Sequence, residues 1–267
     1  MSAPQALSLT KTNTGSAGRT KLNRSQLARL RRKVRRISAV LERNLGVPRR
    51  KSEKPRPLDM LVATILSQNT NDKNSHRAYT ELRRRFPSWE SLAEASLSSI
   101  RSVIRSGGMA NQKSVRIRDI LLTVRHRFGR YSLATLERLT DDEVIDQLVA
   151  LHGVGVKTAA CVLLFSLGRD VFPVDTHVFR VCSRLGLTPG SKAPDDTFFR
   201  MRPLVPRGKS HTLHTNMIRF GRRICRSAVP RCGICPLYGD CVYEGKKRAI
   251  RNSPSPADHD FMLLDNV

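Results

Sequence analysis

Long apolar runs are missing from this 267-residue sequence: the longest, residues 159–165, has seven residues, whereas a membrane-spanning helix needs about 18. We therefore expect a soluble protein without a membrane segment. Acidic residues are also scarce, with 22 Asp and Glu against 48 Lys and Arg, and the first of them is Glu42. The net charge of +26 indicates a polyanionic partner, and the commonest polyanions are nucleic acids and anionic membranes.

Aromatic residues make up only 5% of the chain. This scarcity argues against a sheet that stacks bases on aromatic rings, and it suits helices that grip a nucleic-acid backbone. No stretch alternates as a half-buried strand would, and we find no internal repeat. The length allows one large or two small domains with a proper core. The sequence therefore predicts an all-α protein.

The N-terminal region divides into a tail and a basic helix. Residues 1–23 are rich in Ser, Thr, Ala and Gly without periodicity, which is typical of a disordered basic tail, although an organelle transit peptide has a similar composition. Residues 19–56 contain fifteen Lys or Arg against two acidic residues. Apolar residues nevertheless recur there at helical spacing, namely Leu27, Leu30, Val34, Ile37, Val40 and Leu41. We expect a docked basic helix whose cations either face solvent or contact phosphates.

The following segment, up to residue 128, predicts a series of helices. Pro57 opens a helix that is apolar almost all round and therefore buried. Six consecutive polar residues, 67–72, end it. Further helices are expected over residues 73–86, 89–95, 98–104 and 113–128, with a loop at residues 106–111.

A glycine hairpin between two helices is the first candidate site. Residues 141–151 carry apolar residues on one helical face, and Thr140 and Glu143 have capping-box spacing. Gly153 and Gly155 follow, then a second helix over residues 156–167 with Lys157 in its first turn. A helix N-terminus of this kind can bind a phosphate. A P-loop does not fit, because Val156 precedes the lysine, but an ordinary helix end remains an alternative.

Four of the six cysteines form a second candidate site, with the spacing C-x6-C-x2-C-x5-C. Zinc sites usually have two C-x2-4-C knuckles, and only one is present here. Disulfides are disfavoured because the two remaining cysteines lie in apolar helical surroundings typical of reduced protein. Uneven all-thiolate ligation favours an iron-sulfur cluster. The cysteines are Cys225, Cys232, Cys235 and Cys241, and the nearby Arg222, Arg223, Arg226 and Arg231 would balance the cluster or hold phosphates.

A third feature is Asp175, which stands just ahead of a predicted helix over residues 178–185. A carboxylate there caps the helix and interacts favourably with its dipole. Capping alone is a sufficient explanation for this residue, and catalysis is the alternative.

Taken in this order, the hairpin with Lys157, the Val174-Asp175-Thr176-His177 box and the four-cysteine loop resemble the endonuclease III family, within the helix-hairpin-helix DNA glycosylase superfamily. The resemblance covers about residues 24–247. It implies a six-helix domain, residues 58–168, and a discontinuous iron-sulfur cluster domain, residues 24–57 and 169–247. The tails, residues 1–23 and 248–267, lie outside the two domains.

The resemblance also implies an activity, in which Lys157 is the lyase nucleophile and Asp175 the catalytic carboxylate. A lysine attacks only as the free amine, and the first turn of a helix disfavours its positive charge. The expected enzyme excises a damaged base, an oxidised pyrimidine in the first place, and cleaves the abasic site by β-elimination. The four cysteines would hold a 4Fe-4S cluster, and the partner would be double-stranded DNA with a damaged base or abasic site. We expect a monomer located inside the cell with the DNA.

DNA contacts follow from the same resemblance. Gln68 or Asn69, together with Met109, would fill the gap left by a flipped nucleotide, although ordinary loop packing also explains them. His152, Gly153 and Gly155 would contact the backbone. His152 stands where many relatives have proline, and Asn69 where endonuclease III has glutamine. These two differences concern the preference for one damaged base over another, which the sequence does not decide. The alternatives are a monofunctional glycosylase and a non-catalytic DNA-binding module. An adenine glycosylase fits poorly, since Thr64 stands at the position of its catalytic glutamate.

Overall fold

The computed structural model describes residues 22–50 and 52–251, and in these residues all regular structure is helical, so the predicted all-α class is confirmed. None of the described helices is long and apolar enough to cross a membrane. The main helices are α1 (Arg24–Leu45), α2 (Pro57–Ser67), α3 (Asp72–Arg85), α4 (Trp89–Glu94), α5 (Leu97–Val103), α6 (Ala110–Phe128), α7 (Asp141–Val149), α8 (Val156–Cys161), α9 (Thr176–Arg184), α10 (Pro194–Met201), α11 (Ser210–Arg223) and α12 (Lys246–Arg251).

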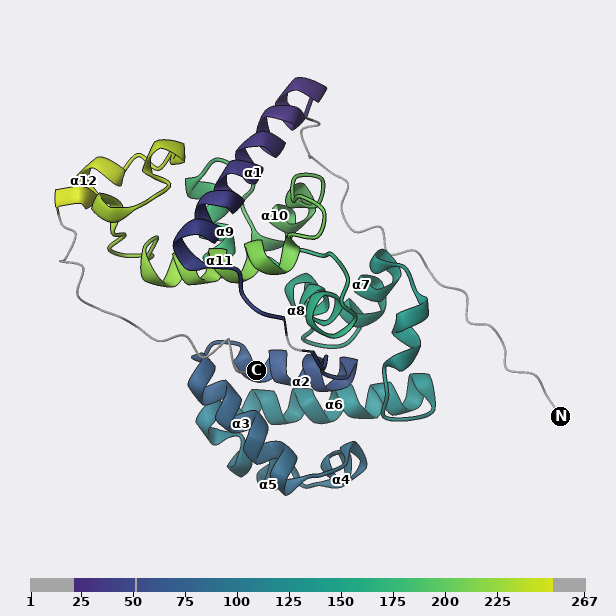
Figure 1. Ribbon diagram of the computed structural model, residues 1–267. Coiled ribbons are helices and arrows are strands. Elements are labelled where there is room, and N and C mark those ends of the chain that lie inside the picture. Colours follow the sequence, from purple (N-terminus) through teal and green to yellow (C-terminus); the bar gives the residue numbers. More distant parts are fainter. Residues whose placement is uncertain (1–21, 51, 252–267) are drawn as a thin grey trace.

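The helices form two groups (Figure 1). Helices α2 to α6 make up the lower group, α1 and α9 to α12 the upper group, and α7 and α8 lie between them. Within the lower group α2 packs against α3 and α6, and it also contacts α8. In the upper group the N-terminal α1 packs on the distant α11, where Asn216 Nδ2 donates to the Gly46 carbonyl over 2.8 Å. The predicted domains, residues 58–168 and residues 24–57 with 169–247, stay a prediction.

The predicted tails lie mostly outside the described residues. Of the N-terminal tail, residues 22–23 are described, and Asn23 makes a capping box with Gln26 at the start of α1. Of the C-terminal tail, residues 248–251 belong to α12. That helix therefore continues four residues into the segment predicted as a tail, where Arg248, Ala249, Ile250 and Arg251 are all tolerated in a helix.

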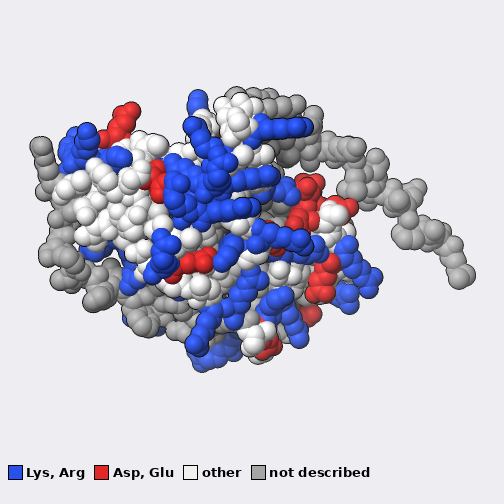
Figure 2. Space-filling model, turned by 45° about the horizontal axis from the view of Figure 1, so that its top comes forward, with Lys and Arg blue, Asp and Glu red and all other residues white. Residues whose placement is uncertain are grey.

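Helix α1 confirms the predicted basic helix. Its apolar face is buried against the upper group, and Figure 2 shows Lys and Arg crowded on the exposed side. Several of these cations hold the fold together: Arg31 Nε donates to the Pro203 carbonyl over 2.8 Å, and Arg36 forms an ion pair with Asp240. The basic run is therefore partly structural.

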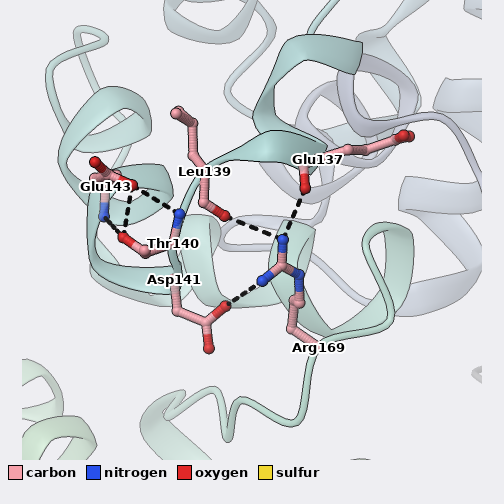
Figure 3. A network of polar contacts seen from close by, with 6 residues as sticks. All are labelled: Glu137, Leu139, Thr140, Asp141, Glu143 and Arg169. Atoms are coloured by element: carbon pink, nitrogen blue, oxygen red, sulfur yellow. Dashed lines mark hydrogen bonds and ion pairs between the residues drawn. The ribbon is translucent and has the colours of Figure 1, made fainter.

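The hairpin begins as predicted and then deviates. Helix α7 has the Thr140–Glu143 capping box but ends at Val149. The second helix is α-helical only to Cys161, after which Val162–Ser166 widens into a π-helical turn, with Leu167 N bonded to the Val162 carbonyl over 3.0 Å. Arg169 follows this turn and binds the start of α7 (Figure 3). Its guanidinium donates hydrogen bonds to the Glu137 and Leu139 carbonyls and to Asp141 Oδ1.

Two other helices, α6 and α9, begin two or three residues earlier than predicted. Helix α6 starts at Ala110, three residues before the expected Lys113, because Met109 turns the chain in a left-handed conformation and Ala110 to Gln112 are compatible with a helix. Lys113 consequently lies inside the helix. Helix α9 starts at Thr176, directly after its cap Asp175.

Candidate active site

The two hairpin glycines have different roles. Gly153 has a φ of 78°, the left-handed conformation that favours glycine, whereas Gly155 is extended, with φ −100° and ψ 174°. Of the two, only Gly153 therefore needs the conformational freedom of glycine. A Cβ on Gly153 would lie 2.1 Å from Arg116 Nε, while one on Gly155 would meet nothing within 4 Å. His152 lies exposed beside them.

Lys157 and Asp175 act on the same two buried groups. Burial raises the pKa of the Cys161 thiol, which the Lys157 charge opposes and the Asp175 carboxylate reinforces. Burial lowers the pKa of His214 to about 4, with Asp175 opposing this shift and Lys157 adding to it. Both charges therefore act on the same thiol of α8 and on the same imidazole of α11.

The Asp175 carboxylate caps α9, as the sequence predicts. Its Oδ1 accepts a hydrogen bond from Val178 N over 2.7 Å, and among the described residues Oδ2 has no hydrogen-bond donor. A hydrogen bond from α11 holds the segment that carries Asp175: His214 Nδ1 donates to the Pro173 carbonyl over 2.9 Å. His214 is 3% exposed. Sequence reasoning missed it, because its partner lies 41 residues away.

The two candidate wedge residues Asn69 and Met109 lie side by side. Asn69 Nδ2 is 3.4 Å from Met109 Sδ. Within the described residues they are the two non-glycine residues with positive φ, at 53° and 50°, a conformation that costs free energy and often occurs at functional sites. Met109 is 46% exposed although it is apolar. The structure thus brings together loops that are 40 residues apart in the sequence.

Gln68 points toward the hairpin instead. Its Oε1 accepts a hydrogen bond from Arg116 Nη1 over 2.8 Å, and its Nε2 lies 3.5 Å from Thr158 Oγ1. Arg116 also packs directly against Gly153. Arg116 was not predicted, because it belongs to no local sequence motif. It connects the C-terminal end of α2 to the hairpin.

The four cysteines, Cys225, Cys232, Cys235 and Cys241, line one pocket beyond the end of α11. Arg184, which the sequence did not single out, lies in this pocket with its Nη1 3.5 Å from Cys225 Sγ. In the described part of the chain no three His, Cys, Asp or Glu side chains could hold a single metal ion. Four thiolates around a shared pocket are the donor set of a cubane iron-sulfur cluster, so the residues fit that cofactor.

Two of the arginines near the cysteines, Arg231 and Arg222, make different contacts. Arg231 lines the cysteine pocket. Arg222 instead pairs with Asp72 at the start of α3, where its Nη2 donates to Oδ1 over 3.0 Å. Arg222 therefore joins α11 of the upper group to α3 of the lower group.

Comparisons with known proteins agree with this architecture. The chain is 36% identical over 198 residues to the Arabidopsis thaliana protein At3g47830, whose name marks it as a candidate DNA glycosylase, covering 70% of this chain and 67% of that protein. It is 32% identical over 198 residues to endonuclease III of Thermotoga maritima, covering 73% and 88%. An endonuclease III solved in a non-covalent complex with DNA matches with a TM-score of 0.70 and 26% identity, covering 82% of this chain and 97% of that one.

Some relatives are much longer. The chain spans 11% of the length of Protein ROS1A of Oryza sativa subsp. japonica, to which it is 30% identical over 223 residues. The family model described as "HhH-GPD superfamily base excision DNA repair protein" matches residues 62–207, more than half of the chain. The chain therefore belongs to the HhH-GPD superfamily of base excision DNA repair proteins.

Proposed function

We propose that this protein is a bifunctional DNA glycosylase and AP lyase that excises a damaged base, an oxidised pyrimidine in the first place, from double-stranded DNA. The observation that carries the proposal is the Asp175 carboxylate, which keeps one oxygen without a donor among the described residues. Its charge acts on the same buried groups, Cys161 and His214, as the charge of Lys157. A non-catalytic DNA-binding module has no need for such an amine and carboxylate.

In this proposal Lys157 Nζ attacks as the free amine. It adds to C1′ of the deoxyribose, the bond from C1′ to the base breaks, and the base takes a proton as it leaves. Loss of a proton from nitrogen and opening of the sugar give a Schiff base between Nζ and C1′. Removal of a proton from C2′ then expels the 3′ phosphate, which is β-elimination.

Asp175 assists at the first step. The developing sugar cation is stabilised by a carboxylate close to C1′, and the same group can take a proton. Its Oδ1 already accepts the Val178 N–H, so Oδ2 is the oxygen we assign to the substrate. His214 fixes the carbonyl of Pro173 and so positions the carboxylate.

Extrusion of the nucleotide needs groups that fill the gap. Of Gln68 and Asn69, we assign this role to Asn69, because Gln68 is bonded to Arg116 while Asn69 lies against Met109. The exposed Met109 side chain supplies an apolar wedge. His152, Gly153 and Gly155 are proposed to contact the DNA backbone next to Lys157.

The four cysteines are proposed to hold a 4Fe-4S cluster. Cleavage of a glycosidic bond transfers no electrons, so the cluster would supply structure. The chain's own residues shape this loop: Arg184 Nη1 donates to the Arg226 carbonyl over 2.7 Å, and its guanidinium lies 4.4 Å from the centre of the Tyr243 ring.

A duplex panel with oxidised pyrimidine, uracil or mismatched thymine tests the function. Each product is divided, and one half receives hot alkali. We expect strand cleavage without alkali, strongest for the oxidised pyrimidine. Cleavage that appears only after alkali would indicate a monofunctional glycosylase, and binding without base release would indicate a DNA-binding module. Both outcomes would overturn the proposal.

A further inference from the structure

A buried lysine lies between the two loops that carry Asn69 and Met109. Lys113 of α6 is 2% exposed. Its Nζ donates to the Leu66 carbonyl and to the Gly107 carbonyl, each over 2.8 Å. Burial lowers the pKa of Lys113 to about 8, and the Arg116 charge contributes. Burying an ammonium group without a carboxylate partner is costly, so a methionine would be expected here if packing were the whole requirement.

The two carbonyls have a particular place in the chain. Leu66 is in the last turn of α2, three residues before Asn69, and its carbonyl is one of those that a helix end leaves without a helical partner. Gly107 closes a short helical turn, Arg105–Gly107, two residues before Met109. Gly107 also packs so closely that an added Cβ would lie 3.1 Å from Ala78 Cβ of α3.

One ammonium group thus ties both loops to α6. Asn69 follows the Leu66 carbonyl, and Met109 follows the Gly107 carbonyl. Both residues have a left-handed backbone conformation, and their side chains are in contact. Such conformations persist only where the surroundings hold them.

We infer that Lys113 is a positioning residue that locks the Asn69 and Met109 loops together, so that both enter the DNA gap as one preformed unit. The inference rests on the proposed function, and it assigns Lys113 no contact with DNA.

The test compares borohydride trapping on an abasic site in duplex and in single-stranded DNA, because a wedge is needed only where a nucleotide must leave a stack. Lys113→Met should trap roughly tenfold more slowly on duplex, since two hydrogen bonds from a charged donor are lost. On the single strand its rate should stay within about twofold of the wild-type rate. Lys73→Met is the matched control, because Lys73 is exposed in the first turn of α3, and it should match wild type on both substrates.

A double-mutant cycle separates positioning from general stability. Met109→Ala should slow duplex trapping by itself, and Lys113→Met added to it should cost less than about twofold more, because its effect acts through Met109. If Lys113→Met does not fold, as judged by circular dichroism, Lys113→Gln takes its place. The glutamine side chain is one atom shorter and reaches one of the two carbonyls at best, so it should still slow trapping on duplex, by less than Lys113→Met would, and leave trapping on the single strand unchanged.

Equal losses on duplex and single-stranded DNA, or full additivity with Met109→Ala, would overturn the inference. A wild-type protein that traps on neither substrate would overturn the proposed function instead. In that case fluorescence of 2-aminopurine opposite an abasic site, which reports insertion without chemistry, decides about Lys113. A smaller signal with Lys113→Met than with wild type supports the inference, and an unchanged signal overturns it.

Discussion

His214 joins the middle of α11 to the segment before Asp175, and its burial makes the protein sensitive to acid. Its pKa of about 4, against an ordinary value of 6.5, means that the unfolded chain binds a proton more readily. The stabilisation from the neutral imidazole is therefore complete above pH 6.5 and is lost as the pH falls toward 4. By pH 5 the loss amounts to roughly 2 kcal/mol.

The measurement is the unfolding free energy at pH 7 and pH 5. His214→Gln, which can still donate to the Pro173 carbonyl without titrating, should lose less stability over this interval than wild type. An equal loss in both proteins would show that other groups cause the acid sensitivity.

Asp175 has both a structural and a proposed chemical role, and Asn separates them. Asp175→Asn keeps a comparably good cap, so its melting temperature should stay near that of wild type, whereas Asp175→Ala should lose about 1 kcal/mol. Base excision by Asp175→Asn should slow by ~10² or more under single-turnover conditions. Wild-type excision by the Asn variant would reduce Asp175 to a helix cap.

At this scale, residues within a short motif could be predicted and residues that act across the fold could not. Lys157 and Asp175 stand out because a hairpin and a cap are local patterns. Arg116, Lys113 and His214 could not be predicted, since each has a partner far away in the sequence, at 48, 47 and 41 residues respectively. No local pattern encodes such contacts.

Among the elements, the hairpin offers a matched pair of glycines. Gly153→Ala forces a left-handed alanine and a collision with the Arg116 guanidinium, so it should cost about 1–2 kcal/mol from the backbone alone. It should also disturb the Arg116 bond to Gln68. Gly155→Ala meets no atom and needs no unusual φ. Its unfolding free energy should therefore stay within about 0.5 kcal/mol of wild type. Equal destabilisation in both variants would contradict this hairpin geometry.

Helix starts with a local sequence signal were predictable in two cases, and backbone deviations were not. The Thr140–Glu143 capping box marked the start of α7, and Pro57 in the first helical position marked the start of α2. The π-helical turn after Cys161 could not be foreseen, because its apolar residues suit an ordinary α-helix equally well. The early start of α6 depends on Met109 adopting a left-handed conformation, which sequence propensity disfavours.

On the scale of the whole molecule, the cysteine pocket joins the C-terminal loop to α9 and α11 through Arg184. Purified protein should contain about four irons per chain and absorb blue light. Cys232→Ser should lower iron content and thermal stability before it affects the rate of the fraction that remains folded. Stoichiometric zinc without iron after anaerobic purification would contradict the cluster.

The all-α class was predictable from the missing strand pattern, and the polyanionic partner was indicated by charge alone. How the two groups of helices meet was not, because the Arg222–Asp72 pair spans 150 residues. The sequence also does not distinguish the cations of helix α1 that contact other parts of the fold from those that face solvent.

The central claim is that the Lys157 amine forms a covalent bond with the sugar, and borohydride trapping on abasic duplex DNA tests it most directly. Wild type should give a complex that survives a denaturing gel, and Lys157→Gln should give none while still binding the DNA, because only one of several phosphate-scale contacts changes. Lys73→Gln, a lysine in the first turn of another helix, should trap like wild type. Trapping by Lys157→Gln at the wild-type rate would contradict the account and assign the chemistry to another amine.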